Sequence, residues 1–228
     1  MNKKSTVLAV AALGALLMPS QAHAMHITEG ILPFGWASLW FVVAAPFVGF
    51  GLYKIKRDKS VASVKPLLGM MGAAVFIISC MPIPVPTAGT CSHPAGTAMA
   101  AILIGPVYSV VAAAVALLLQ ALFLAHGGLT TWGANVFSMG VVGSFAGYAV
   151  YKGLTGLNAP LVVAAFFAGV IGDWATYTAT SFALASAIAG PGDALSLFYT
   201  IMLAFVPTQL PLGIVEGFIT AGAVKLLH

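Results

Sequence analysis

Long apolar segments separated by short polar loops dominate the sequence after residue 30. A helix needs about 20 mostly apolar residues to cross the hydrocarbon core of a bilayer, and most of these segments approach or exceed that length. The apolar segments cover residues 36–53, 66–81, 96–125, 131–151, 160–188 and 195–227. The pattern therefore predicts an all-α membrane protein, built as a polytopic helical bundle.

The segment 96–125 is interrupted by Gly105 and Pro106. It is either one long kinked helix or two helices joined by a turn. Lys152 follows a later span and Lys225 lies near the C-terminus, and a turn at Gly105 would place both lysines on the cytoplasmic side, as the positive-inside rule favours. We therefore expect a turn. This gives seven transmembrane helices, with the N-terminus outside and the C-terminus inside.

Composition and charge support a membrane location. The chain is 61% hydrophobic and only 6% charged, whereas a soluble domain carries about 25% charged residues. Five of the nine basic residues lie between Lys54 and Lys65. Such a cluster is typical of a cytoplasmic loop and too small for a nucleic-acid-binding face, so we expect a lipid bilayer and no nucleic acid as partner.

The first 24 residues have the pattern of a cleavable signal peptide. Lys3 and Lys4 precede a short apolar stretch at 6–18, and Ala22 and Ala24 supply small residues for cleavage. The alternative is an uncleaved signal anchor. Cleavage after Ala24 would leave residues 25–228 as a single transmembrane domain, with an unmodified α-amine on Met25 outside the cytoplasm.

A mature terminus at Met25 would resemble a metal chelator. The α-amine and the His26 amide nitrogen close a five-membered ring on one metal, and the His26 amide and Nδ1 close a six-membered ring. His93, expected on the same outer face, could supply a fourth nitrogen. Four nitrogens in a plane suit Ni(II), Cu(II) or low-spin Co(II) better than zinc. The alternative is a solvated terminal histidine and an unrelated loop histidine.

Other polar residues could support such a site. Glu29 could balance the charge of the amine or the metal. His126 and Asn135 are candidates for orienting a ligand, and a purely structural loop role is the alternative for His126. Asp173 and Glu216 fall inside predicted spans, where an ionisable group is costly and therefore a functional candidate. They would serve as proton relays or as neutral, hydrogen-bonded groups of the bundle.

The remaining motifs argue against catalysis by this chain. It has no Walker-type phosphate loop and no defensible nucleophile–base arrangement, so we expect no enzyme activity. Cys80 and Cys91 are too few for a disulfide scaffold. A disulfide between them and a pair of buried thiols both remain open.

Several stretches together are similar to one family. They are MHITEG at 25–30, GTCSH at 89–93, LLQAL at 118–122, HGGLTTWGAN at 126–135, GDW at 172–174 and PLGIVEG at 211–217. The chain resembles the CbiM/NikM family, the substrate-binding (S) components of cobalt and nickel energy-coupling-factor (ECF) transporters. The resemblance covers essentially the whole predicted mature chain.

The resemblance implies seven transmembrane helices, with the N-terminal segment inserted into the bundle from outside. It implies that the N-terminal amine of Met25, the amide and imidazole nitrogens of His26, and His93 hold the metal. It also implies a bacterial inner-membrane location and three partners: a small CbiN-type membrane subunit, a CbiQ-type coupling protein and a CbiO-type ATPase. The signal peptide departs from the many members that start directly at Met-His, and Cys91 stands where a small residue such as serine is expected.

The expected function is capture of divalent cobalt for an ATP-driven importer that supplies cobalamin synthesis. The bound ion is the transported substrate, and no cofactor is expected. Nickel is the close alternative, because a four-nitrogen site serves both ions. A proton-coupled secondary metal transporter, with Asp173 and Glu216 as proton carriers, is the alternative of a different class.

Overall fold

The computed structural model describes residues 26–57, 61–81, 83–85 and 90–227, so the predicted signal peptide and Met25 lie outside the described residues. The elements are α2 (Phe34–Arg57), α3 (Val61–Ser79), β1 (Ile83–Val85), β2 (Thr90–Ser92), α4 (Thr97–Ile104), α5 (Pro106–Phe123), α6 (Trp132–Asn135), the π-helical η1 (Val136–Gly143), α7 (Ser144–Gly156), α8 (Leu161–Ile188) and α9 (Ala194–Leu227). Because α6, η1 and α7 join into one continuous helix, Trp132–Gly156, this part of the chain contains seven helical segments.

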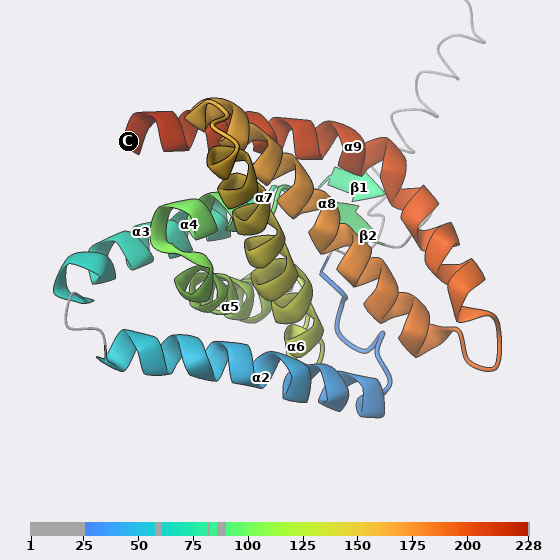
Figure 1. The fold of residues 1–228 in the computed structure, drawn as a ribbon. Helices are drawn as coiled ribbons and strands as arrows, with labels where there is room; N and C mark the ends of the chain where they lie inside the picture. Colours follow the sequence, from blue (N-terminus) through green and yellow to red (C-terminus); the bar gives the residue numbers. More distant parts are fainter. Residues whose placement is uncertain (1–25, 58–60, 82, 86–89, 228) are drawn as a thin grey trace, which may run out of the picture.

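The helices form the bundle expected of a membrane protein (Figure 1). Five of the described helices are long and apolar enough to cross a bilayer: α2, α5, the α6–α7 helix, α8 and α9. The two others are shorter. The apolar part of α3 is Lys65–Ser79, and the eight residues of α4 rise only about 12 Å at 1.5 Å per residue. The predicted helical bundle is confirmed, but α4 covers less than half of a hydrocarbon core.

Gly105 forms a turn between α4 and α5. Its φ of 90° and ψ of 150° lie in a region that only glycine adopts without strain. The chain reverses its direction at this turn. A hydrogen bond between the two helices shows this, because the Ser109 hydroxyl in α5 donates to the Thr97 carbonyl at the start of α4, at 2.9 Å. A straight continuation would separate these two residues by about 18 Å. Of the two alternatives for residues 96–125, the structure has the turn.

The proline-rich segment after α3 contains a small β-hairpin. β1 and β2 pair antiparallel, with Ile83 opposite Ser92 and Val85 opposite Thr90. Both strands pack against α9. The helical fold class holds for the bundle, and the segment expected as a loop contains this short hairpin. The hairpin feeds directly into the residues around His93.

Glycines let α8 and α9 approach closely. A Cβ added at Gly169 of α8 would lie 2.8 Å from the Glu216 carbonyl, and one at Gly217 of α9 would lie 2.9 Å from the Phe166 ring. Such contact between backbones is typical of helix pairs in membranes, where packing rather than water release drives association. The close approach fixes where Glu216 lies in the bundle.

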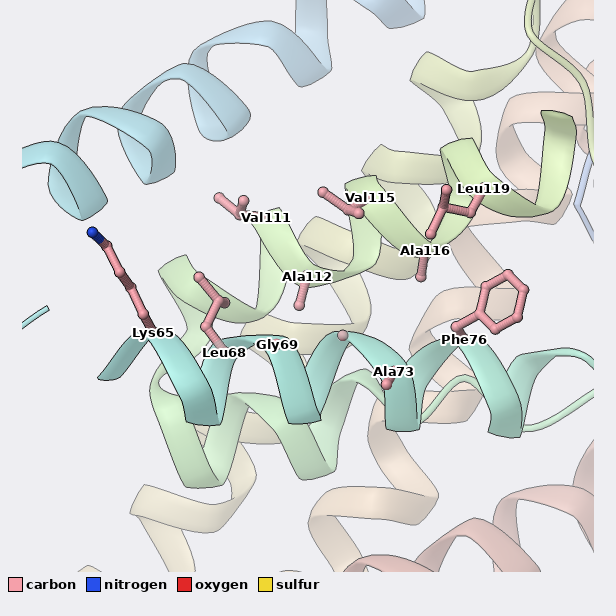
Figure 2. Close-up of a pocket in the computed structure, with 11 residues that line it drawn as sticks. Lys65, Leu68, Gly69, Ala73, Phe76, Val111, Ala112, Val115, Ala116 and Leu119 are labelled. Carbon is pink, nitrogen blue, oxygen red and sulfur yellow. The ribbon is translucent and has the colours of Figure 1, made fainter. Parts of the chain in front are cut away.

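An apolar groove lies between α3 and α5, two helices in contact, on the outside of the bundle. It has a volume of about 510 Å³. Figure 2 shows Lys65 at one end and Phe76 toward the other, with the α5 side chains of Ala112 and Ala116 pointing toward α3. Only Lys65 brings a charge to this lining, so the groove matches a hydrocarbon environment.

Candidate metal centre

Three histidines from distant parts of the sequence come together inside the bundle. His26 lies in the N-terminal segment, His93 in the connection from β2 to α4, and His126 in the loop after α5. One potential ligand nitrogen from each lies within 4.8 Å of the others. The ring centroids are 4.7 Å apart for His26 and His93, and 4.6 Å for His26 and His126. The cluster thus joins the two predicted ligands with the histidine predicted to support them.

Gln120 determines which nitrogen of His26 is available. The His26 Nε2 lies 2.8 Å from Gln120 Oε1. The Gln120 amide group is oriented by donation of its Nε2 to the Phe76 carbonyl at 3.3 Å and to the Ser79 hydroxyl oxygen at 2.7 Å. Because Oε1 can only accept, His26 must carry its proton on Nε2. Nδ1 is left with its lone pair, and Nδ1 is the nitrogen that can chelate together with the residue's own amide nitrogen.

His93 presents the opposite nitrogen. Its Nδ1 donates to the Pro94 carbonyl at 3.0 Å, which leaves the lone pair on Nε2. Among the described residues, the buried Nε2 has no hydrogen-bond partner. The Tyr177 hydroxyl accepts from the His93 amide at 3.1 Å and donates to its carbonyl at 3.0 Å. His93 thus combines a buried side-chain nitrogen, unpaired in the described part of the chain, with a backbone that is held at both its amide and its carbonyl. Both features are typical of a metal ligand.

All three imidazoles are neutral at pH 7. Burial lowers the pKa of His93 to about 3, with a smaller contribution from nearby His126. Burial also lowers the pKa of His126 to about 4. Burial, with the proximity of the two other rings, holds the pKa of His26 well below its usual value. A metal therefore meets neutral imidazoles, each with a lone pair on one nitrogen, and displaces no proton from that nitrogen near neutral pH.

Hydrogen bonds to Ile27 and Glu29 fix the N-terminal segment. Asn135 Oδ1 accepts from the Ile27 amide at 2.8 Å, and its Nδ2 donates to the Ile27 carbonyl at 3.2 Å. The Thr131 hydroxyl donates to the same carbonyl. The Glu29 carboxylate accepts from the Thr130 amide at 3.1 Å, and bonding to Thr130 lowers the pKa of Glu29.

Asn135 therefore holds the backbone next to His26, in line with its predicted supporting role. Glu29 anchors the segment to the loop that follows His126. Gly128 lies so close that a Cβ there would be 2.7 Å from the Glu29 amide nitrogen, so this loop position requires glycine. The N-terminal segment is thus built into the bundle, as Figure 1 shows for the blue trace leading into α2.

Asp173 and Glu216 lie outside the three-histidine cluster found among the described residues. Both are buried, and Asp173 lies beside Glu216. The Glu216 carboxylate accepts from the Ala95 amide at 2.5 Å and from the Gly96 amide at 2.9 Å. Its nearest link to the cluster is therefore the backbone that follows His93.

The sequence interpretation did not single out Gln120, Tyr177 or Thr131 as site residues. Gln120 carried a signal, because it is an isolated amide within the apolar run 118–122. Cys80 is a free cysteine whose Sγ lies 3.4 Å from Gln120 Nε2. The Cys91 side chain lies outside the described part of the structure.

Comparison with known proteins identifies the family. A family model described as the cobalt uptake substrate-specific transmembrane region, CbiM, matches residues 26–228. The chain belongs to the CbiM family. It is 61% identical over 219 residues to the cobalt transport protein CbiM of Geobacter sulfurreducens, a match covering 96% of this chain and 63% of that protein. The chain thus spans less than two thirds of that relative.

Another relative matches over most of both lengths. The cobalt transport protein CbiM of Sorangium cellulosum is 55% identical over 205 residues, which covers 90% of this chain and 91% of that protein. A crystal structure described as a truncated transition metal transporter superposes with a TM-score of 0.78 at 27% identity, covering 89% of this chain and 97% of that one. These matches establish a membrane protein of a transporter family.

Proposed function

We propose that this chain captures divalent cobalt at the outer face of the membrane, as the substrate-specific component of an ATP-driven ECF-type importer. The convergence of His26 and His93 carries the proposal. His26 Nδ1 and His93 Nε2 are left with lone pairs by the hydrogen bonds that their other nitrogens make. Membership of the CbiM family supports cobalt as the ion.

The proposed coordination uses the mature terminus. The Met25 amine, the His26 amide nitrogen and the His26 Nδ1 form two fused chelate rings, and His93 Nε2 completes a nitrogen plane. His126 lies close enough to approach the same ion or to support its neighbours. Cleavage of the signal peptide after Ala24, just before the residues 26–228 that the family model matches, is part of the same proposal.

The proposed importer has a defined membrane topology and uses ATP as its energy source. Seven helices, with the N-terminus outside and the C-terminus in the cytoplasm of a bacterial inner membrane, would open the site to the periplasmic side. ATP hydrolysis is assigned to a separate CbiO-type ATPase, acting through a CbiQ-type coupling protein and with a CbiN-type small subunit. The imported cobalt would supply cobalamin synthesis.

Nickel remains the alternative ion. Both Co(II) and Ni(II) accept nitrogen ligands, and Ni(II) favours a planar arrangement more strongly. A proton-coupled transporter is less well supported, because both oxygens of Glu216 accept backbone hydrogen bonds. The Glu216 carboxylate therefore has a structural role, which is to hold the backbone that follows His93.

Uptake of radioactive cobalt into proteoliposomes tests the proposal. Liposomes containing the chain with its coupling and ATPase partners should accumulate cobalt only when ATP is supplied, and should do so without a proton gradient. His26→Ala and His93→Ala should reduce uptake to background, because each removes a ligand. Asp193→Asn, in the exposed α8–α9 connection, is the control and should transport normally.

Two outcomes would contradict the proposal. Cobalt uptake driven by a proton gradient without ATP would support the secondary transporter instead. Normal uptake by the His93→Ala protein would remove His93 from the site.

A further inference from the structure

The segment that carries His93 is held mainly by helices α8 and α9. The Ser92 hydroxyl lies 2.7 Å from the Thr208 hydroxyl of α9. Tyr177 of α8 bonds both backbone groups of His93. Glu216 of α9 accepts from the next two amides that can donate, those of Ala95 and Gly96. Every residue from Ser92 to Gly96 is buried, so water cannot replace these bonds.

Glu216 acts as a cap supplied from another helix. α4 begins after Gly96, which has a φ of 71° and provides no side chain to cap the helix. The two amides before α4 point to the Glu216 carboxylate, one to each oxygen. A negative charge at a helix N-terminus is favourable, because the unpaired amides and the helix dipole are positive there. The carboxylate therefore fixes the position of this chain segment relative to α9.

The position of α9 is itself sensitive to packing. Pro207 and Pro211 interrupt its backbone hydrogen bonds, and Glu216 lies five residues after Pro211. The Trp174 indole of α8 donates to the Gln209 carbonyl at 3.1 Å. A Cβ at Gly213 would lie 2.4 Å from the same indole nitrogen. Glu216 is thus presented by an interrupted helix that α8 holds in close contact.

We infer that Glu216 is a positioning residue for the metal ligand His93. This inference rests on the proposed metal role of His93. The Ala95 amide that Glu216 binds lies two residues after His93, so a shift of the carboxylate moves the ligand backbone. Metal–ligand distances tolerate changes of only about 0.2 Å. Glu216 therefore connects the position of α9 to the geometry of the metal centre.

Glu216→Gln tests the inference in the purified, full mature chain. Glutamine keeps the size and one acceptor oxygen but turns an NH₂ group toward a backbone amide. Co(II) affinity should fall about 10- to 100-fold, the usual effect of losing an outer hydrogen-bond partner of a metal ligand. The Co(II) absorption spectrum should also change, because His93 Nε2 is displaced. Thr220→Val, a near-isosteric change one turn further along α9 at a buried hydroxyl that has no hydrogen-bond partner within the described structure, should leave both unchanged.

Hydrogen exchange of the segment 92–97 in metal-free protein gives an independent measurement. Exchange should accelerate in the Glu216→Gln protein and remain normal in the Thr220→Val protein. A mere loss of stability would lower the fraction of folded protein but leave the spectrum of the bound ion unaltered. Wild-type affinity and spectrum in Glu216→Gln would overturn the inference.

The two proposals fail in distinguishable ways. If the wild-type chain binds no cobalt, the proposed function fails, and the exchange of segment 92–97 alone decides whether Glu216 holds it. Unchanged exchange in Glu216→Gln would show that the carboxylate does not fix the segment.

Discussion

At the scale of single residues, Gln120 fixes the tautomer of His26 that the proposed metal site requires. Its amide accepts from His26 Nε2 and is itself held by Phe76 and Ser79 of α3. The Ser79 hydroxyl donates in turn to the Val75 carbonyl. This chain of hydrogen bonds fixes both the tautomer and the orientation of the imidazole. It also ties the N-terminal segment to α3 and α5.

Replacing Gln120 by Leu should weaken Co(II) binding about 10- to 100-fold, because the His26 Nε2 proton loses its acceptor and the tautomer is no longer fixed. Titration of the purified protein with Co(II) measures this. Ser79→Ala removes one of the two bonds that hold the Gln120 amide and should weaken Co(II) binding less than Gln120→Leu, since the Phe76 carbonyl still holds that amide. Equal affinities for Gln120→Leu and wild type would show that Gln120 does not set the tautomer.

The sequence predicted the two principal histidines better than their supports. The chelate chemistry of Met25-His26 and the family resemblance together indicated that His26 and His93 meet, and the structure brings them together. The partners of His26 could not be predicted in this way. Gln120 is 94 positions away in the sequence, and its pairing depends on how α5 packs against α3. The ligand roles themselves stay predictions.

At the scale of elements, the α4–α5 turn brings the start of α4 into the bundle. α4 is short because Gly105 reverses the chain after eight residues. The segment 92–96, which carries His93, leads directly into α4.

Gly105→Ala should destabilise the protein by about 1–3 kcal/mol, because a residue with a Cβ is strained at this backbone conformation. Nothing lies within 4 Å of a Cβ at Gly105, so a steric clash would not contribute. Gly153→Ala, in α7 with equally open surroundings, should be neutral or stabilising by about 0.5–1 kcal/mol. Thermal unfolding in detergent compares the two. Equal effects of both changes would contradict the proposed strain.

The helices were easier to predict than the hairpin. Apolar length alone located the spans, since a bilayer requires about 20 apolar residues per crossing. β1 and β2 lie in a proline-rich segment with no alternating pattern, and both strands pack against α9. Their formation therefore depends on tertiary contacts that the local sequence does not encode. The same holds for η1, a π-helical stretch that begins directly after Asn135.

At the scale of the whole molecule, the bundle holds His26 and Ile27, which would lie next to the N-terminus after signal-peptide cleavage. Asn135 and Thr131 hold Ile27, and Gln120 holds His26. These contacts hold the backbone of His26 and Ile27 beside the histidine cluster. If the signal peptide is cut after Ala24, the Met25 amine becomes available at that position. Cleavage would then complete the metal centre as well as orient the chain.

Proton release on cobalt binding tests this account most directly. Near pH 7 the three imidazoles are neutral and a metal displaces no proton from their ligand nitrogens, because burial lowers the pKa of His93 to about 3 and that of His126 to about 4 and holds that of His26 well below its usual value. An amine with a pKa of about 7.7–8.0 and a backbone amide should together release about two protons per ion. A site made of imidazoles alone should release almost none.

The measurement is calorimetric titration of the mature protein, with its N-terminus at Met25 verified, in two buffers of different ionisation enthalpy. The account predicts one Co(II) per chain and the release of about two protons. A bound ion with no proton release would contradict the participation of the amine and the amide. Failure to bind cobalt at all would contradict the metal centre itself.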